Sequence, residues 1–286
     1  MNVHLSKLYL KLVESDLMDR AAQVAFYFSF ALFPLLFFLV SLFGLILVST
    51  EALKGELYDY LYRIMPSSAF ELVRRTVDEI VASSSPGKLT LGLAITLWSA
   101  SAGIDSLRSA LNSVYGLTET RSWWKTKLLS LTITLISIIL IAAVLLIVFY
   151  GWQLVQATLA TVGLEVTSPL VLVSIQWISI FLVMLLACEV IYNLVPDFKN
   201  FRWLWITPGS IVAIALWIIF TGGFRLYLEY FNAYNRTYGS LGAVIILMLW
   251  LYLTAVAVLL GGSINAVYAE NLDEAESRNR ANADDA

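Results

Sequence analysis

Long uncharged stretches dominate the chain and are separated by short polar segments. A bilayer core about 30 Å thick is crossed by roughly 20 apolar helical residues. We predict a transmembrane helix in each of six stretches: 26–48, 89–107, 128–150, 170–195, 203–224 and 241–264. The second stretch is short and rich in Ser and Ala. The pattern therefore predicts an all-α, polytopic membrane protein with six transmembrane helices.

The segment between the first two predicted spans, 50–88, is too long and too regular for a simple connection. Leu53, Leu57 and Leu61 recur at helical spacing before Pro66. We predict two amphipathic external helices, one on each side of this proline. Their apolar stripes must be buried, either on the transmembrane bundle or in the membrane interface. A lid over a cavity, or a surface for an external partner, would use the same stripes.

The polar parts of the chain give three regions and an orientation. Residues 1–20 are predicted to form a cytoplasmic amphipathic segment, 21–270 the six-helix membrane domain, and 271–286 a disordered cytoplasmic tail. Lys and Arg are more frequent in the tails and in the loops after the second and fourth helices than in the other loops. The positive-inside rule therefore predicts that both termini are cytoplasmic.

Aromatic residues lie at the ends of the predicted spans. Trp123 and Trp124 precede the third span, and Trp203 and Trp205 begin the fifth. Trp and Tyr are enriched at membrane–water interfaces, where their rings lie among the lipid headgroups. We interpret these residues as an aromatic belt.

The amino-acid composition excludes several classes of function. Of 286 residues, 59% are hydrophobic and 14% charged, and the mean hydropathy is +0.79. One Cys, Cys188, and one His, His4, exclude a disulfide framework, a Cys- or His-ligated metal site and most His acid–base catalysis. The formal net charge of −3 indicates no nucleic-acid partner. No nucleotide-binding or hydrolase motif occurs, so we expect no enzyme activity, no catalytic residue, no metal and no cofactor.

Two ionisable residues lie inside predicted spans, where charged groups are costly and mark candidate functional sites. Asp105 is followed by Arg108 at i+3, so a local ion pair near the interface is one interpretation. Glu189 has no basic neighbour in the sequence, and Asn193 shares its helix face at i+4. A polar cavity, a structural pairing across helices and a proton relay all remain open for Glu189.

Further polar residues fall toward the predicted cytoplasmic ends of the spans. They are Gln23, Tyr27, Ser99, Ser101, Asn112 and Asn265. They are consistent with a vestibule open to the cytoplasm, and equally with hydrogen bonds between helices. We select Glu189, Asn193, Asp105, Asn265, Gln23 and Tyr27 as candidates for lining a cavity. Pro34 and the pair Pro208–Gly209 are predicted to interrupt the first and fifth spans.

Four stretches resemble motifs of the YihY/BrkB family of bacterial inner-membrane proteins. They are AAQVAFYFSFALFPLLFFL (21–39), LWSASAGIDSLRSALNSVYG (97–116), IYNLVPDFKNFRWLWITPGSIVAIALW (191–217) and YNRTYGSLGAVIILMLWLYLTAVAVLLGGSINA (234–266). The order and spacing match the family from about residue 15 to 270. Matching positions include Pro34, Ser99, Ser101, Asn112, Tyr234, Asn235, Tyr238 and Gly239.

This resemblance implies a multi-pass protein of the bacterial plasma membrane with both termini in the cytoplasm. It supplies no catalytic residue, and the residues offer no chemistry for the family's former ribonuclease name. Many members carry an acid where this chain has Ser263. We expect a transporter-like protein that handles a lipid or a small solute in a polar intramembrane cavity, with membrane lipids as its surroundings. The alternative is a membrane scaffold or envelope-assembly factor acting through the loop 51–85. The sequence leaves a homo-oligomer open.

Overall fold

The computed structural model describes residues 11, 13–31, 55, 58, 74, 86–161, 169–199, 203–230 and 240–284. The chain divides into two compact units, one formed by 1–29 with 103–286 and the other by 30–102. The polar residues discussed below belong to the first unit, except Ser99 and Ser101, which belong to the second. All regular secondary structure in the described part is helical. The predicted all-α class is therefore confirmed.

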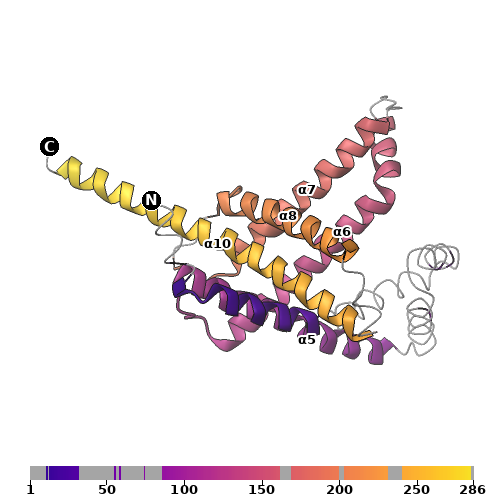
Figure 1. The fold of residues 1–286 in the computed structure, drawn as a ribbon, viewed down its shortest axis with the longest axis horizontal. Helices are drawn as coiled ribbons and strands as arrows, with labels where there is room; N and C mark the ends of the chain where they lie inside the picture. The colour runs from indigo at the N-terminus through magenta and orange to yellow at the C-terminus, as the bar shows by residue number, and fades with distance from the viewer. Residues whose placement is uncertain are drawn as a thin grey trace. The chain divides into compact units, whose positions relative to one another are not determined.

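The described part of the chain is built from long helices (Figure 1). A helix over 17–31 precedes α5 (Pro86–Tyr115), α6 (Trp123–Thr161), α7 (Pro169–Leu194), α8 (Pro208–Tyr230) and α10 (Ser240–Asp284). The α5–α6 and α7–α8 connections are short. They bring the end of α5, the start of α6, the end of α7 and the start of α8 to the same end of the unit, where the contacts described below join them.

Four of the described helices contain stretches long and apolar enough to cross a membrane. These are Trp123–Val148, Val173–Leu194, Pro208–Tyr227 and Val244–Asn271. They correspond to the predicted third to sixth spans. The predicted second span lies within α5, which is not among the four. Most of the predicted first span, with Pro34, and nearly all of the external loop lie outside the described residues. The number six and the side of the termini therefore stay predictions.

Two helix ends differ from the predicted spans. The predicted interruption at Pro208–Gly209 is wrong, because α8 begins at Pro208 and continues past Gly222–Gly223 to Tyr230. Proline suits the first position of a helix, since its missing N–H would have no partner there. The tail predicted to be disordered continues α10 as far as Asp284. No Gly or Pro follows Gly262, and the Ala, Glu and Arg of this segment favour helix.

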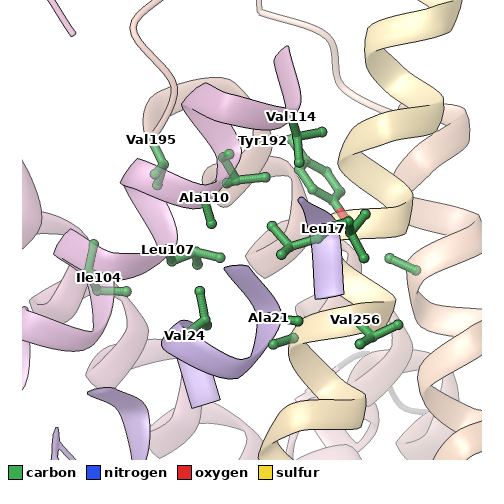
Figure 2. Close-up of a cluster of buried hydrophobic side chains, with 14 of the residues drawn as sticks. Leu17, Ala21, Val24, Ile104, Leu107, Ala110, Val114, Tyr192, Val195 and Val256 are labelled. Carbon is green, nitrogen blue, oxygen red and sulfur yellow. The ribbon is translucent and has the colours of Figure 1, made fainter. Parts of the chain in front are cut away.

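A core of small and branched apolar side chains joins the N-terminal helix to α5 and α10. Figure 2 shows Leu17, Ala21 and Val24 near Leu107 of α5 and Val256 of α10. Lipid tails are as apolar as these side chains, so close packing rather than the hydrophobic effect must hold membrane helices together. Alanine and glycine permit that packing. A Cβ at Gly103 would lie 3.2 Å from the Phe28 ring.

Helices α8 and α10 run side by side and make the most extensive contacts of any described pair (Figure 1). A Cβ at Gly209 would lie 2.0 Å from the carbonyl oxygen of Gly261, and one at Gly261 would lie 2.4 Å from the Tyr192 hydroxyl. The backbones therefore touch at this crossing, as small residues allow in membrane bundles. Tyr192 of α7 adds a hydrogen bond of 2.7 Å to the carbonyl oxygen of Val258.

Candidate polar centre and ion-pair network

The carboxylate of Glu189 is buried within the α7 span, with 2% of the residue exposed. Its Oε1 accepts hydrogen bonds from the backbone N–H of Thr207 at 2.8 Å and from the Thr207 hydroxyl at 3.1 Å. Its Oε2 accepts one from the Asn193 amide at 3.1 Å. These donors are all neutral groups. No ion pair among the described residues reaches Glu189.

Thr207 links this carboxylate to the start of α8. The residue occupies the N-cap position directly before Pro208, and its side-chain and carbonyl oxygens accept from the N–H of Ser210. The first N–H groups of a helix have no partner within it and carry partial positive charge. The carboxyl group of Glu189 therefore lies beside the positive end of the α8 dipole.

Asn193 fixes the segment that leads into α8. Its amide oxygen accepts from the N–H of Leu204 at 3.0 Å, and its amide nitrogen donates to the Leu204 carbonyl at 3.1 Å. The side chain thus replaces a backbone partner for Leu204 and places Thr207 within reach of Glu189. Glu189 and Asn193, which share a helix face at i+4, are joined by a hydrogen bond of 3.1 Å.

Asn265 brings α10 into the same group. Its amide oxygen accepts from the N–H of Gly209 at 2.7 Å, and its amide nitrogen donates to the Thr207 hydroxyl at 3.0 Å. The hydroxyl of Tyr115, the last residue of α5, also forms a hydrogen bond with Asn265. We call Tyr115, Glu189, Asn193, Thr207 and Asn265 the polar centre. Hydrogen bonds among these residues join the four helices α5, α7, α8 and α10.

A separate group of charges lies where α5 meets α6. Asp105 accepts a hydrogen bond of 2.9 Å from the Lys127 ammonium and one of 2.5 Å from the Ser130 hydroxyl. The predicted pair of Asp105 with Arg108 is present but long, at 3.7 Å. Arg108 instead makes its close contact with Glu119 in the α5–α6 connection. Asp105 is therefore paired with cations and not part of the polar centre.

The network continues from Glu119 to the end of α7. Arg121 contacts Glu119 at 2.7 Å and Asp197 at 3.3 Å. Asn112 donates to Glu119 and accepts from the backbone N–H of Asp197. Burial tends to raise the pKa of Glu119 and Asp197, but hydrogen bonds and the arginine charge outweigh it. The pKa of each carboxyl is held below its usual range, for Glu119 by Arg121 and Arg108 and for Asp197 by Thr120 and Arg121.

The other selected residues are distributed outside the polar centre. Gln23 and Tyr27 are exposed on the N-terminal helix, and the hydroxyls of Ser99 and Ser101 donate to carbonyls of α5 itself. Asn112 belongs to the ion-pair network. Pro34, Tyr234, Asn235, Tyr238 and Gly239 lie outside the described residues. The structure thus brings Glu189, Asn193 and Asn265 together and leaves Asp105, Gln23 and Tyr27 apart.

Sequence reasoning missed Thr207, which links Glu189 and Asn265 to the start of α8. The pattern Thr-Pro-Gly at 207–209 was a usable signal, because Thr is a good N-cap and Pro suits the next position. It also missed the link from Arg121 to Asp197. No short-range pattern predicts this pair, because 76 positions of the chain separate the two residues.

Exposed tryptophans surround this end of the unit. Trp124 is 71% exposed and Trp205 is 77% exposed. Trp205 lies only two residues before Thr207, the hydrogen-bond partner of Glu189. Such side chains suit the headgroup region of a membrane. The interpretation of these residues as a belt stays a prediction, and it would place the polar centre near one membrane surface.

These features define a helical membrane protein with several apolar helices and a hydrogen-bonded polar group among them. The model of the virulence factor BrkB family matches residues 8–286. A putative ribonuclease-like protein of Bacillus subtilis, YfkH, is 31% identical over 249 residues, which cover 87% of this chain and 89% of YfkH. The chain belongs to the BrkB family, as its motifs suggested.

More distant relatives are named membrane proteins. A UPF0761 membrane protein of Xanthomonas oryzae is 27% identical over 266 residues, and one of Xanthomonas campestris is 27% identical over 262 residues. Each match covers 90% of this chain and 58% of the relative, so the chain spans less than two thirds of their length. No solved structure matches the chain.

Proposed function

We propose that this protein is transporter-like and handles a lipid or a small solute at the polar centre. The observation that carries the proposal is the burial of Glu189 within an apolar span, with neutral hydrogen-bond donors as its partners. An ionisable group in such a place is expensive and is a functional candidate by default. A carboxylate that balances a helix terminus can exchange these partners for a cargo's polar group or for a proton.

Among cargo classes, the position of Glu189 favours a lipid headgroup. Trp205 and Leu204 are exposed beside Thr207, so an aromatic belt here puts Glu189 just below the headgroup region. A lipid could present its headgroup to this depth while its acyl chains stay in the bilayer. A soluble compound would first have to leave water. No nucleotide-binding motif occurs in the sequence, so transport would be passive or coupled to an ion.

The test is to identify what the protein carries. The full chain is extracted into lipid nanodiscs, and co-purifying small molecules are measured by mass spectrometry against empty nanodiscs. The variant Glu189→Gln keeps the shape but removes the charge, and Asp105→Asn is a matched loss of charge outside the polar centre. We expect one lipid or solute to be enriched in the wild type and Asp105→Asn samples and lost in Glu189→Gln. Bulk lipids in bulk proportions would contradict the proposal.

The alternative function is a membrane scaffold or envelope-assembly factor. The observation in its favour is that both hydrogen bonds to Oε1 of Glu189 come from Thr207 and fix the start of α8, which is a structural task. On this alternative, deleting the loop 51–85 removes an external partner while the remaining helices still fold, and Glu189→Gln changes neither cargo nor partner. Co-purification of the two variants separates the functions.

The name of YfkH raises ribonuclease activity, which we propose this chain lacks. RNA hydrolysis needs metal-binding carboxylates or His acid–base groups. The chain has one His, His4, and the described residues contain no group of three His, Cys, Asp or Glu able to hold a metal. Incubation of the purified protein with RNA and Mg²⁺ or Mn²⁺ should leave the RNA intact, and cleavage at a rate proportional to protein concentration would contradict this.

A further inference from the structure

The polar centre and the ion-pair network meet at Tyr115. Its hydroxyl forms a hydrogen bond with Asn265. Its ring packs edge-to-face on Phe198, with ring centroids 5.1 Å apart and an interplanar angle of 80°. Phe198 directly follows Asp197. The position of Tyr115 over the polar centre therefore depends on the first residues after α7.

Those residues are tied to α5 and to the α5–α6 connection. Oδ2 of Asp197 accepts from both the N–H and the hydroxyl of Thr120 at 2.7 Å, and its Oδ1 lies 3.3 Å from Nε of Arg121. Asn112 accepts from the N–H of Asp197 at 2.9 Å, and Arg121 donates to the carbonyl oxygen of Val195 at 3.0 Å. Short hydrogen bonds thus cross between two connections that are far apart in the sequence.

We propose that Asn112, Thr120, Arg121 and Asp197 form a latch that closes the polar centre, and that its release admits water to Glu189. The inference rests on the proposed role of Glu189 as the working polar group. Release of Asp197 frees Phe198, and with it the ring of Tyr115, from the polar centre. These contacts tie Asp197 and Phe198 to α5 and to the α5–α6 connection.

The strength of the contacts in the latch suits reversible opening and closing. The side chains of Asp197 and Arg121 retain 12% and 20% of their exposure, so both border the solvent, whereas Glu189 is buried. Partly exposed ion pairs contribute little net stability because water competes for the same groups. A closed state held by such bonds needs only a modest difference in cargo affinity to be opened. Fully buried pairs would be too costly to separate.

Cys188 gives the chain a built-in reporter, since it is the single cysteine and precedes Glu189. The full chain in nanodiscs is treated with a water-soluble maleimide, and the labelling rate is compared among wild type, Asp197→Ala and Asp105→Ala. The two variants are comparable, because each removes a carboxylate that contacts a cation and accepts from a hydroxyl, and Asp105 also lies 3.7 Å from Arg108. We expect about fivefold faster labelling in Asp197→Ala, as expected for the loss of a weak pair, and a rate near wild type in Asp105→Ala.

A second reporter covers the case in which the thiol of Cys188 points away from the polar centre. Ser210→Cys in a Cys188→Ala background places a thiol at a fully buried position beside Thr207. Faster labelling of either reporter in Asp197→Ala but not in Asp105→Ala supports the latch. Equal rates in all proteins, or equal acceleration by both variants, would overturn it. Labelling requires no cargo, so failure of the latch leaves the Glu189→Gln cargo test standing, and failure of that test leaves the labelling result standing.

Discussion

At the scale of single residues, the carboxylate of Glu189 satisfies donors from two different segments. Replacement by alanine leaves the N–H and hydroxyl of Thr207 and one N–H of Asn193 without this acceptor in a buried place. A buried group without its partner costs about 1–3 kcal/mol. Replacement by glutamine keeps one acceptor oxygen. We therefore expect Glu189→Ala to lower the free energy of unfolding at least about twice as much as Glu189→Gln.

Thermal unfolding of both variants in one detergent, followed by loss of the monodisperse peak in size-exclusion chromatography, measures this difference. If the two substitutions are equally harmless, Glu189 does not fix the start of α8. The combination of an intact Glu189→Gln fold with lost cargo would separate the role of its charge from the role of its hydrogen bonds.

The sequence predicted only some of the contacts between single residues. The i+4 spacing placed Asn193 beside Glu189, because both lie on one helix. It could not show that Asn265 and Tyr115 join them, since those contacts depend on how α5, α7, α8 and α10 pack. Asp105 was also selected as a cavity candidate beside its ion-pair interpretation, and Lys127 and Ser130 reach it from the next helix.

At the scale of helices, contact between α8 and α10 depends on glycine. We expect Gly261→Ala to disrupt the pair, because the new Cβ would lie 2.5 Å from the Gly209 carbonyl oxygen, which cannot move without its helix. Gly222→Ala on α8 is the control, since no atom lies within 4 Å of its Cβ. Alanine favours helix over glycine by about 1 kcal/mol, so the control should be neutral or slightly stabilising. Comparison of folded yield and melting temperature checks both expectations.

The stability that the connections between helices contribute should fall at acid pH. The pKa values of Glu119 and Asp197 are lowered in the folded protein, so their stabilisation is complete above their ordinary pKa of about 4. It is lost as pH falls through the lowered values. The melting temperature should therefore change little between about pH 8 and 5 and fall below about pH 4. Asp197→Ala should be less stable at neutral pH and show a smaller acid-dependent loss, and an unchanged pH profile in this variant would argue against the network.

Helix boundaries show why local pattern alone was insufficient at this scale. Hydropathy placed the start of the fifth span at 203, because Trp203, Leu204 and Trp205 are apolar. The helix starts at Pro208, since Asn193 and Glu189 hold the preceding backbone in another conformation. Conversely, low hydropathy suggested disorder after 270, although α10 continues to Asp284.

At the scale of the whole molecule, the number and order of the apolar stretches predicted the helical class, and four motifs predicted the family. Stretch length suffices for the helical class because a helix needs roughly 20 apolar residues to cross the bilayer. The same argument could not predict the contacts among Glu119, Arg121 and Asp197, because these residues lie in polar connections with no periodicity.

The tryptophans at the start of α6 and before α8 should mark one membrane surface. Trp124 and Trp205 are expected to be quenched by lipids brominated near the headgroup more than by lipids brominated near the chain ends. Replacement of both by phenylalanine removes that component of the fluorescence, and Trp250→Phe, on the α10 span, is the matched control. Stronger quenching from the chain ends would place the polar centre deep in the bilayer and remove the argument for a headgroup.

The most direct test of the central claim is lipid movement by the purified protein. The wild type, Glu189→Gln and Asp105→Asn are each reconstituted into vesicles of phosphatidylethanolamine and phosphatidylglycerol with fluorescent phosphatidylethanolamine in both leaflets, and dithionite is added outside. The account predicts that wild type and Asp105→Asn let dithionite consume inner-leaflet label, whereas Glu189→Gln leaves it protected, as do vesicles without protein. Protection of inner-leaflet label by the wild type, or equal loss with Glu189→Gln, would contradict the claim that Glu189 handles a lipid headgroup.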